Sequence, residues 1–344
     1  MKNKITIYEI AKKASMSVAT ISRALNPETR DKVAAETRLG IDKLVQRYGY
    51  TPNMAARHLR KTSYQTIGIL FPHHEGIFLS EYYSQILSGV ADQLLGSDYY
   101  LKMVLLKPKK PKWDAYDFKA GEGVDGLIVT YWRTFFSNAS VLENLNVPCT
   151  IISNFEKDVK AHFVSGDHFQ GGQIAAEHLY SHGHKKIAVL TGAGGAADAQ
   201  QRLDGFRSFL AQKNIRLGPN SIFDVQFKEE EAYKFTETLL NKRPDITAIF
   251  CMNDTLALGV LKKLKELGID CPKKISVIGY DNDRRSEHAS PSLTTIQVPV
   301  YEAAKKATEH LIQYLSDKDA KRFFYTHEML PASLVERKSV RVIG

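Results

Sequence analysis

Residues 6–26 of this chain read TIYEIAKKASMSVATISRALN. In the first half of the stretch, Ile7, Ile10, Ala11 and Ala14 recur at three- and four-residue intervals. That spacing places apolar side chains on one face of a helix and leaves the charged ones on the other. The first half therefore predicts a short amphipathic helix.

A second short helix is expected directly after it. Ser17 is a favourable cap for a helix over residues 18–25, which Asn26-Pro27 would end. Thr6 and Glu9 have the spacing of a capping box at the start of the first helix. Two such helices joined by a three-residue turn form a helix-turn-helix, so the stretch predicts a small helical head.

The net charge of the chain is concentrated on this head. Residues 1–61 hold 13 Lys and Arg against 5 Asp and Glu, a net charge of +8. The other residues hold 34 basic and 33 acidic side chains and contribute only +1 to the total of +9. A basic excess on a short helical segment favours a polyanionic partner such as DNA over an ordinary solvated surface.

The same stretch resembles the DNA-binding head of the LacI/GalR family of bacterial transcriptional regulators. Thr37-Arg38 and GYTPNMAARHL at 49–59 extend the resemblance, which continues to LPASLVERKS at 330–339. Two positions depart from the family pattern: Ser15 stands where Gly is usual, and Gly40 interrupts the third helix. The resemblance implies a helix-turn-helix domain at 1–50, a hinge helix and linker at 51–63, and a two-lobed effector-binding and dimerisation domain at 64–344.

The body alternates short β-branched runs with helical segments, a pattern typical of parallel sheets with helices on both faces. The expected fold class is therefore an α-helical head plus an α/β body of two doubly wound parallel-sheet lobes. The resemblance implies lobes of the periplasmic-binding-protein type, with chain crossings near 153–165 and 280–292. The expected bounds are about 64–155 and 290–318 for the N-lobe, and about 160–285 and 322–340 for the C-lobe.

The resemblance also implies that the second helix of the head enters the major groove. Val18, Ala19 and Arg23 match the base-reading positions; Arg23 can donate two hydrogen bonds to guanine, and the other two can only read thymine methyls or shape. The Ser17 hydroxyl could cap the helix, contact a phosphate, or both. The other polar residues of the head expected at the DNA are Thr6, Thr20, Ser22 and Asn26.

Residues 53–60 are expected to form the hinge. Asn53 can cap a helix that is too short to be stable alone in water. The resemblance implies that this helix orders on DNA, with Leu59 wedged into the minor groove and Ala56 and Arg57 beside it. A flexible linker with an incidental leucine is the alternative.

The chain carries no recognisable catalytic motif, so it is not expected to be an enzyme. It lacks a P-loop, GxSxG and HExxH, and its three cysteines show no CxxC spacing. The eleven histidines are scattered, and His73-His74 and His182-Gly183-His184 are expected in turns, with structural or solvent-exposed roles. No metal ion and no cofactor are expected.

The effector site is expected where loops meet beyond the carboxyl ends of the strands. Arg202, Asn253 and Asp281 match family positions that grip ligand, and Asp254 is expected to cap the following helix. A structural inter-lobe salt bridge is the alternative for Arg202 and Asp281. The aromatic candidates for an apolar sugar face are Tyr82, Trp132 and Phe169. A sugar is the expected effector, and a purine or other base is the alternative, since members of the family bind those.

The expected partners are a double-stranded DNA operator, a small effector and a second copy of the chain. The N-terminal sequence lacks the features of a signal peptide and no apolar run could span a bilayer, so a cytoplasmic, non-membrane protein is expected. A sugar-binding protein of the transport type is the alternative that this expectation disfavours. The chain has no heptad tail after 337, which favours a dimer, and the Lys- and Pro-rich segment 107–112 is expected to be a solvated loop.

Overall fold

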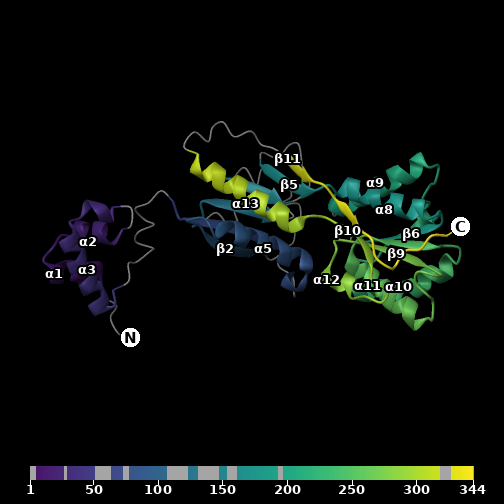
Figure 1. Ribbon diagram of the computed structural model, residues 1–344, viewed down its shortest axis with the longest axis horizontal. Coiled ribbons are helices and arrows are strands. Elements are labelled where there is room, and N and C mark those ends of the chain that lie inside the picture. The colour runs from purple at the N-terminus through teal and green to yellow at the C-terminus, as the bar shows by residue number, and fades with distance from the viewer. Residues whose placement is uncertain are drawn as a thin grey trace. The chain divides into compact units, whose positions relative to one another are not determined.

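The chain forms two compact units, Met1–Tyr64 and Gln65–Gly344, in the computed structural model (Figure 1). The structure describes residues 5–26, 29–50, 63–72, 77–106, 123–130, 147–152, 161–192, 197–317 and 327–343. Several predicted features lie outside these residues: Asn53, Ala56, Arg57, Leu59, Trp132 and the segment 107–112.

The first unit is a helix-turn-helix with a third helix behind it. Its elements are α1 (Ile7–Ala14), α2 (Val18–Leu25), the short 3-10 helix η1 (Arg30–Lys32) and α3 (Ala35–Tyr48). Ile10, Ile21 and Ile41, one from each α-helix, are completely buried against one another. The apolar spacing of the sequence therefore builds the core of the head, and α3 runs through Gly40 without a break.

The N-lobe of the second unit is built on a six-stranded parallel sheet of order β11-β5-β4-β3-β1-β2. Helices α5 (Glu81–Leu94) and α13 (Val300–Ser316) pack on each other, and η2 (Ile77–Leu79) precedes α5. The strands are β1 (Thr66–Pro72), β2 (Tyr100–Leu106), β3 (Gly126–Thr130), β4 (Cys149–Ile152), β5 (His162–Gly166) and β11 (His327–Leu330).

The C-lobe has a second six-stranded sheet, of order β12-β10-β9-β8-β6-β7, in which only β12 runs antiparallel to its neighbour. The strands are β6 (Ile187–Thr191), β7 (Ile222–Asp224), β8 (Ala248–Cys251), β9 (Ser276–Tyr280), β10 (Thr294–Gln297) and β12 (Ser333–Val335). The helical segments are α8 (His168–Ser181), α9 (Ala197–Gln212), η4 (Pro219–Ser221), α10 (Glu229–Lys242), α11 (Asp254–Glu266) and α12 (Arg284–Glu287).

The C-lobe sheet is buried on both faces. Along β6, Ile187 and Val189 belong to one apolar cluster, while Ala188 and Leu190 belong to another. Alternating side chains of a strand point to opposite faces of the sheet. Figure 1 shows α8 and α9 on one side of this sheet and α10 and α11 on the other. This is the doubly wound arrangement that the alternating sequence pattern predicts.

The lobe boundaries differ from those expected. Strand β5 belongs to the N-lobe sheet, although residues from about 160 onward were expected in the C-lobe. Strand β10 belongs to the C-lobe sheet and β11 to the N-lobe sheet, the reverse of the expectation for these two strands, whereas α13 in the N-lobe and β12 in the C-lobe lie in the lobes expected for 290–318 and 322–340. The chain therefore crosses between lobes after Gly166, after Gln297 and after Leu330. These strands are only three to five residues long and mix polar with apolar residues, so their sequence signal is weak.

Helices α8 and α9 approach each other at backbone distance. A Cβ on Gly172 would lie 2.1 Å from the Arg202 carbonyl oxygen, and a Cβ on Gly205 would lie 1.9 Å from the Phe169 carbonyl oxygen. Only glycine fits at such crossings. The close crossing places the first turn of α8 directly beside Arg202 on α9, which sets the geometry of the candidate effector site.

Candidate DNA-binding and effector-binding sites

Polar side chains at the helix starts of the head are used as caps. The Thr20 amide donates to Ser17 Oγ at 3.0 Å, and the Ser17 and Thr20 hydroxyls lie 2.9 Å apart. Thr6 and Glu9 form the predicted capping box, in which the Thr6 amide donates to Glu9 Oε2 at 2.7 Å. Asn26 ends α2, and its amide donates to the Arg23 carbonyl. The capping role expected for Ser17 is confirmed, and its hydroxyl stays exposed enough for a phosphate contact.

The candidate base-reading residues differ in exposure. Arg23 and Ala19 are exposed, whereas Val18 and Ser22 are half-buried and Val18 packs against the core of the head. Among the described residues, nothing pairs with the Arg23 guanidinium. Arg23 is therefore the candidate with both the reach and the free donors to read a base edge.

Acidic side chains of the head are neutralised by local partners. Arg30 and Asp42 form an ion pair with an N–O distance of 2.5 Å, and Arg38 pairs with Asp31 at 3.0 Å. Each pair cancels one acidic and one basic side chain, so the net basic excess of the head is unchanged and can attract a phosphate backbone.

A narrow cavity lies between the two lobes of the body. Residues of both lobes line it, at and beyond the carboxyl ends of their strands: Tyr82, Ile152, Ser165, Gly166, His168, Asp198, Val298, Val300 and Ala303. In folds with open parallel sheets, ligands bind at this edge. The cavity therefore lies at the edge where the effector site was expected, but of the effector candidates among the described residues only Tyr82 lines it; Arg202, Asn253, Asp281 and Phe169 do not.

Arg202 is the centre of a buried polar cluster next to this cavity. The side chain is 4% exposed. Its Nη1 donates to the Met252 carbonyl at 2.5 Å, and its Nε donates to His168 Nδ1 at 3.3 Å. Its guanidinium carbon lies 4.0 Å from the centroid of the Tyr280 ring. A buried guanidinium with this many partners is held in one orientation, which suits a ligand-gripping group.

The contacts of His168 define its tautomer. Nδ1 accepts from Arg202, so the proton of the neutral ring lies on Nε2, which faces Asp198 Oδ2 at 3.5 Å. The Tyr280 hydroxyl, 3.2 Å from Nδ1, then acts as a second donor. Burial and the neighbouring Arg202 charge hold the pKa of His168 well below its ordinary value. The ring is therefore neutral and orients both Arg202 and Tyr280.

Asp281 completes the cluster with a strained backbone. Its Oδ1 lies 3.2 Å from Arg202 Nη2 but lacks hydrogen-bond geometry, and its φ of 99° is in the left-handed region. Burial raises the pKa of the Asp281 carboxyl, and the Arg202 charge opposes this. Both residues belong to the C-lobe, so the pair is not the inter-lobe salt bridge considered from the sequence. Strain of this kind is concentrated at functional sites.

The helix cap expected at Asp254 is instead provided by Asn253. Asn253 is the N-cap of α11, and its side-chain oxygen accepts from the Leu256 amide at 2.8 Å. Asp254 is 1% exposed and accepts from the Asp283 amide at 2.8 Å and from Thr295 Oγ1 at 2.7 Å. Both residue types cap helices well, so the sequence could not decide between them. Asn253 can still offer its amide NH₂ group to a ligand, because the cap uses only its oxygen.

The aromatic candidates are placed differently with respect to the cavity. Tyr82 lines it and packs edge-on against Tyr83, with ring centroids 5.4 Å apart. Phe169 is in the first turn of α8, next to His168, and is 39% exposed. Trp132 lies outside the described residues.

Sequence reasoning missed three members of the cluster: His168, Asp198 and Tyr280. A usable signal existed for two of them. His168 follows the carboxyl end of a strand by two residues, and Asp198 precedes Arg202 by four residues, so they share a helix face. Tyr280 is the last residue of β9 and reads in the sequence as an ordinary buried strand residue.

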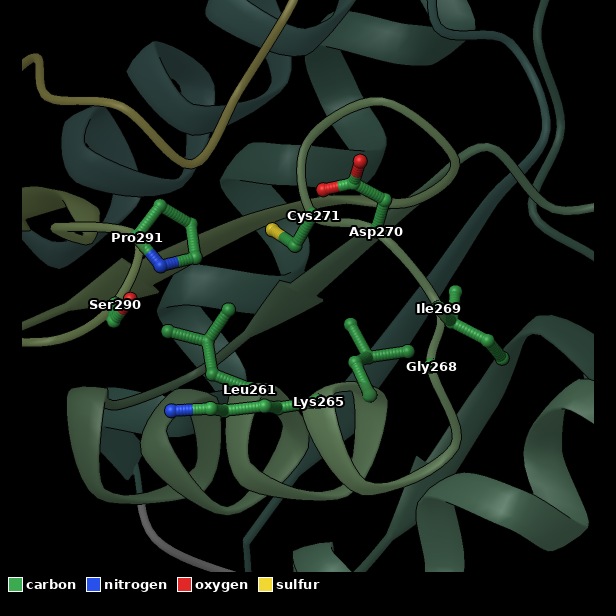
Figure 2. Close-up of a pocket in the computed structure, with 9 residues that line it drawn as sticks. Leu261, Lys265, Gly268, Ile269, Asp270, Cys271, Ser290 and Pro291 are labelled. Atoms are coloured by element: carbon green, nitrogen blue, oxygen red, sulfur yellow. The ribbon is translucent and has the colours of Figure 1, made fainter.

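A larger hollow, of about 440 Å³, lies elsewhere on the C-lobe (Figure 2). Leu261 and Lys265 project into it from α11, opposite Cys271 and Pro291. None of the predicted effector residues lines it. The smaller inter-lobe cavity is the better candidate, because the buried ionisable residues His168 and Asp198 line it and Arg202 lies in contact with His168.

Among the described residues, no helix is both long enough and apolar enough to cross a membrane.

Comparisons with known proteins agree with this architecture. Residues 6–53 match the family of bacterial regulatory proteins called the lacI family, and residues 176–340 match a periplasmic binding protein-like domain. The chain is 32% identical to the HTH-type transcriptional repressor PurR of Aliivibrio salmonicida, over 97% of this chain and 98% of that protein.

Solved structures agree as well. A lac repressor dimer bound to operator and the anti-inducer ONPF matches with a TM-score of 0.82 at 23% identity, covering 98% of this chain and all of that one. A LacI-family regulator from Enterococcus faecium with bound ribose matches with a TM-score of 0.68 at 26% identity, covering 81% of this chain and all of that one. The first of these likenesses supports the fold alone.

Proposed function

The chain belongs to the LacI family of bacterial regulatory proteins and is a DNA-binding transcriptional repressor, and we propose that a small polar effector in the inter-lobe cavity controls it. The observation that carries this proposal is the Arg202–Asp281 pair next to the cavity, in which a buried arginine of α9 meets an aspartate with a strained backbone directly after β9. An effector that prefers one arrangement of the lobes biases the protein between DNA-competent and DNA-incompetent states.

The DNA complex that we propose is a two-fold dimer on a pseudo-palindromic operator. Each α2 would lie in the major groove, with Arg23 reading a guanine and Ala19 and Val18 reading thymine methyls or shape. The capping hydroxyls of Ser17 and Thr6, with Thr20, Ser22 and Asn26, would hold the register through phosphates. The hinge residues Asn53, Ala56, Arg57 and Leu59 would meet at the operator centre.

A sugar is the effector that we favour. Arg202 supplies charged donors and Asp281 supplies acceptor oxygens close together, a combination suited to vicinal hydroxyl groups. Asn253 can add a donor, and the Tyr82 and Phe169 rings can cover an apolar sugar face.

A nucleobase is the second candidate. The Arg202 guanidinium offers donors and the Asp281 carboxyl offers acceptor oxygens, and the same groups can pair with the polar edge of a base. The two candidates differ in the class of compound that should stabilise the protein.

The test is a thermal-shift screen of the full chain with sugars, sugar phosphates and nucleobases, followed by calorimetric titration of each hit. A ligand at 100 times its Kd stabilises the folded state by about 2.7 kcal/mol, which is readily detected. We expect Asp281→Asn to weaken effector binding by about tenfold or more, with effector-free operator affinity unchanged. The matched control is Asp245→Asn, which removes the carboxylate of another Asp–Arg pair of the same lobe, with Arg243.

If Asp281→Asn binds the effector as tightly as the parent chain, the Arg202–Asp281 pair is only structural. If nucleobases alone stabilise the protein, the sugar proposal fails while the site assignment stands.

A further inference from the structure

A cluster of His178, His182 and Glu336 lies on the C-lobe, apart from the polar cluster around Arg202. His178 is in the last turn of α8 and His182 is its C-cap, while Glu336 follows β12. One potential ligand atom from each of the three side chains lies within 4.8 Å of the other two. Segments some 150 residues apart in the sequence are thus brought together at one point.

The spacing of the two histidines allows both side chains to bind the same metal ion. Residues four apart lie on the same face of a helix, and His pairs at this spacing bind zinc in other helices. Here the two rings face each other with centroids 4.2 Å apart. Around a tetrahedral zinc ion with bonds of about 2.0–2.1 Å, ligand atoms are about 3.3 Å apart. Small side-chain rotations, easiest for the exposed Glu336, would bring the three groups to that distance.

The hydrogen bonding of both histidines leaves lone pairs available. His182 Nδ1 lies 2.7 Å from the His178 carbonyl oxygen, which can only accept, so Nδ1 carries the proton and Nε2 keeps its lone pair. A histidine that ligates a metal usually donates its other ring N–H to such a carbonyl. His178 is 6% exposed, and its Nε2 is buried with no hydrogen-bond partner among the described residues. Buried polar atoms without partners are rare in native proteins.

We propose that His178, His182 and Glu336 form a binding site for a divalent transition metal ion of the zinc type. Two imidazoles and one carboxylate are a borderline donor set that suits Zn²⁺, Co²⁺ or Ni²⁺, and a single carboxylate is too few oxygen ligands for Ca²⁺ or Mg²⁺. A water molecule would supply the fourth ligand. His184 is not a member, because its nitrogens contact Thr247 Oγ1 at 2.9 Å and the Arg341 carbonyl at 3.0 Å.

The site departs from the sequence-based expectation, which assigned no metal and placed His182 in a turn. The sequence shows the two histidines four apart, but Glu336 is brought to them only by the path of the chain after β12. That segment already contacts the end of α8, where the Ile343 amide donates to the His182 carbonyl at 2.9 Å. A bound ion would therefore fasten the segment after β12 to α8 and stabilise the C-lobe.

The test is competition for Zn²⁺ between the full-length protein, freed of metal with a chelator, and a chromophoric zinc indicator. We expect one strong site per chain. His182→Ala and Glu336→Gln should each weaken Zn²⁺ binding by about tenfold or more, because each removes one of only three protein ligands. The matched control is His288→Ala, at an exposed histidine of the same lobe, which should bind Zn²⁺ as the parent chain does.

Two further measurements make the outcome decisive. Co²⁺ bound at the site should show the intense visible absorption of a four-coordinate ion, absent in His182→Ala. At the same Zn²⁺ concentration, the melting temperature should rise less for the two ligand variants than for the parent chain and His288→Ala. The proposal is overturned if the parent chain binds no stoichiometric Zn²⁺, or if His182→Ala and Glu336→Gln bind it as tightly as the parent. A Co²⁺ spectrum unchanged from that of the aqueous ion would also overturn it. His178→Ala is not used, because its buried position would confuse binding with folding.

Discussion

Arg23 is the residue that we propose to read the DNA sequence. Its guanidinium is exposed and unpaired among the described residues, so it enters the complex without losing an internal partner. We expect Arg23→Ala to lose about 1–3 kcal/mol of discrimination at one base pair of each half-site. Operator variants measured by fluorescence anisotropy check this. Neutralising Lys4 or Lys61 is the comparison, since loss of a phosphate contact weakens all sequences alike and lowers the salt slope.

If Arg23→Ala instead lost the same amount of affinity for every operator variant, Arg23 would be a phosphate contact.

Asp254 makes the stability of the body depend on pH. Burial raises the pKa of its carboxyl to about 8, so the folded state holds a proton that the unfolded chain releases near pH 4. The contribution of Asp254 to stability is therefore greatest below about pH 4 and falls as the pH rises to about 8, by up to ~1.4 kcal/mol per pH unit. Asp254→Asn should remove this slope while keeping the shape of the side chain.

Denaturant unfolding of Asp254→Asn and of the parent chain at several pH values measures the difference directly. Asp245→Asn, at a more exposed carboxylate, is the control and should leave the slope of the parent in place. If the free energies of unfolding of Asp254→Asn and of the parent chain changed with pH in parallel, Asp254 would ionise at an ordinary pKa.

Single residues also show how far the sequence predicts the effector site. Arg202 and Asp281 were proposed as effector residues from the sequence, and the structure places Arg202 Nη2 3.2 Å from Asp281 Oδ1. His168 and Tyr280 were missed because their role depends on a helix crossing that no local pattern encodes. The helix cap was assigned to Asp254 instead of Asn253 for the same reason: Asp254 is buried by contacts with Asp283 after β9 and Thr295 in β10, which no local pattern encodes.

Helix α3 is weaker than its length suggests, because Gly40 lies within it. A Cβ at Gly40 would meet no atom within 4 Å, so alanine fits there without strain. We expect Gly40→Ala to stabilise α3 by about 1 kcal/mol, the difference in helix propensity between the two residues. Hydrogen exchange of the α3 amides in the full chain should slow by about fivefold.

Replacing Gly49 with alanine should have the opposite effect on the stability of α3. Gly49 ends α3 with a φ of 61°, also with open space around its Cβ position. An alanine there must adopt the left-handed conformation, which costs about 1 kcal/mol or more. Gly49→Ala should therefore speed exchange in α3. A similar effect of both substitutions would show that the helix propensity at Gly40 does not limit the stability of α3.

Secondary-structure elements were predicted well where they are long and periodic. The helices of the head, α5 and α9 to α11 were all expected close to where they lie. The short strands β5, β11 and β12 were not, since three to five residues of mixed polarity carry little signal. Their pairing partners lie far away in the sequence, and the lobe boundaries were misplaced for this reason.

At the scale of the whole molecule, the two compact units are expected to have separate roles, DNA binding in the first and effector binding in the second. Residues 1–61 hold nearly all the net charge, and the unit from Gln65 onward holds the inter-lobe cavity. We expect removal of residues 1–61 to abolish salt-sensitive operator binding, while the remaining body stays folded and binds effector with unchanged affinity. Mobility-shift assays and calorimetry on the same preparation check both parts. A truncated body that still bound operator specifically would contradict the division.

The three crossings between lobes have a consequence for protein synthesis. The N-lobe sheet needs β11, at residues 327–330, and α13 packs against its strands, although four of its strands lie before residue 153. At about 5–20 residues per second, roughly 10–50 s pass on the ribosome between the first strand of this sheet and its last. Five of the six C-lobe strands emerge in the meantime. The nascent chain thus holds an incomplete apolar sheet for most of its translation, and we expect it to depend on chaperones that shield such surfaces until the last strand arrives.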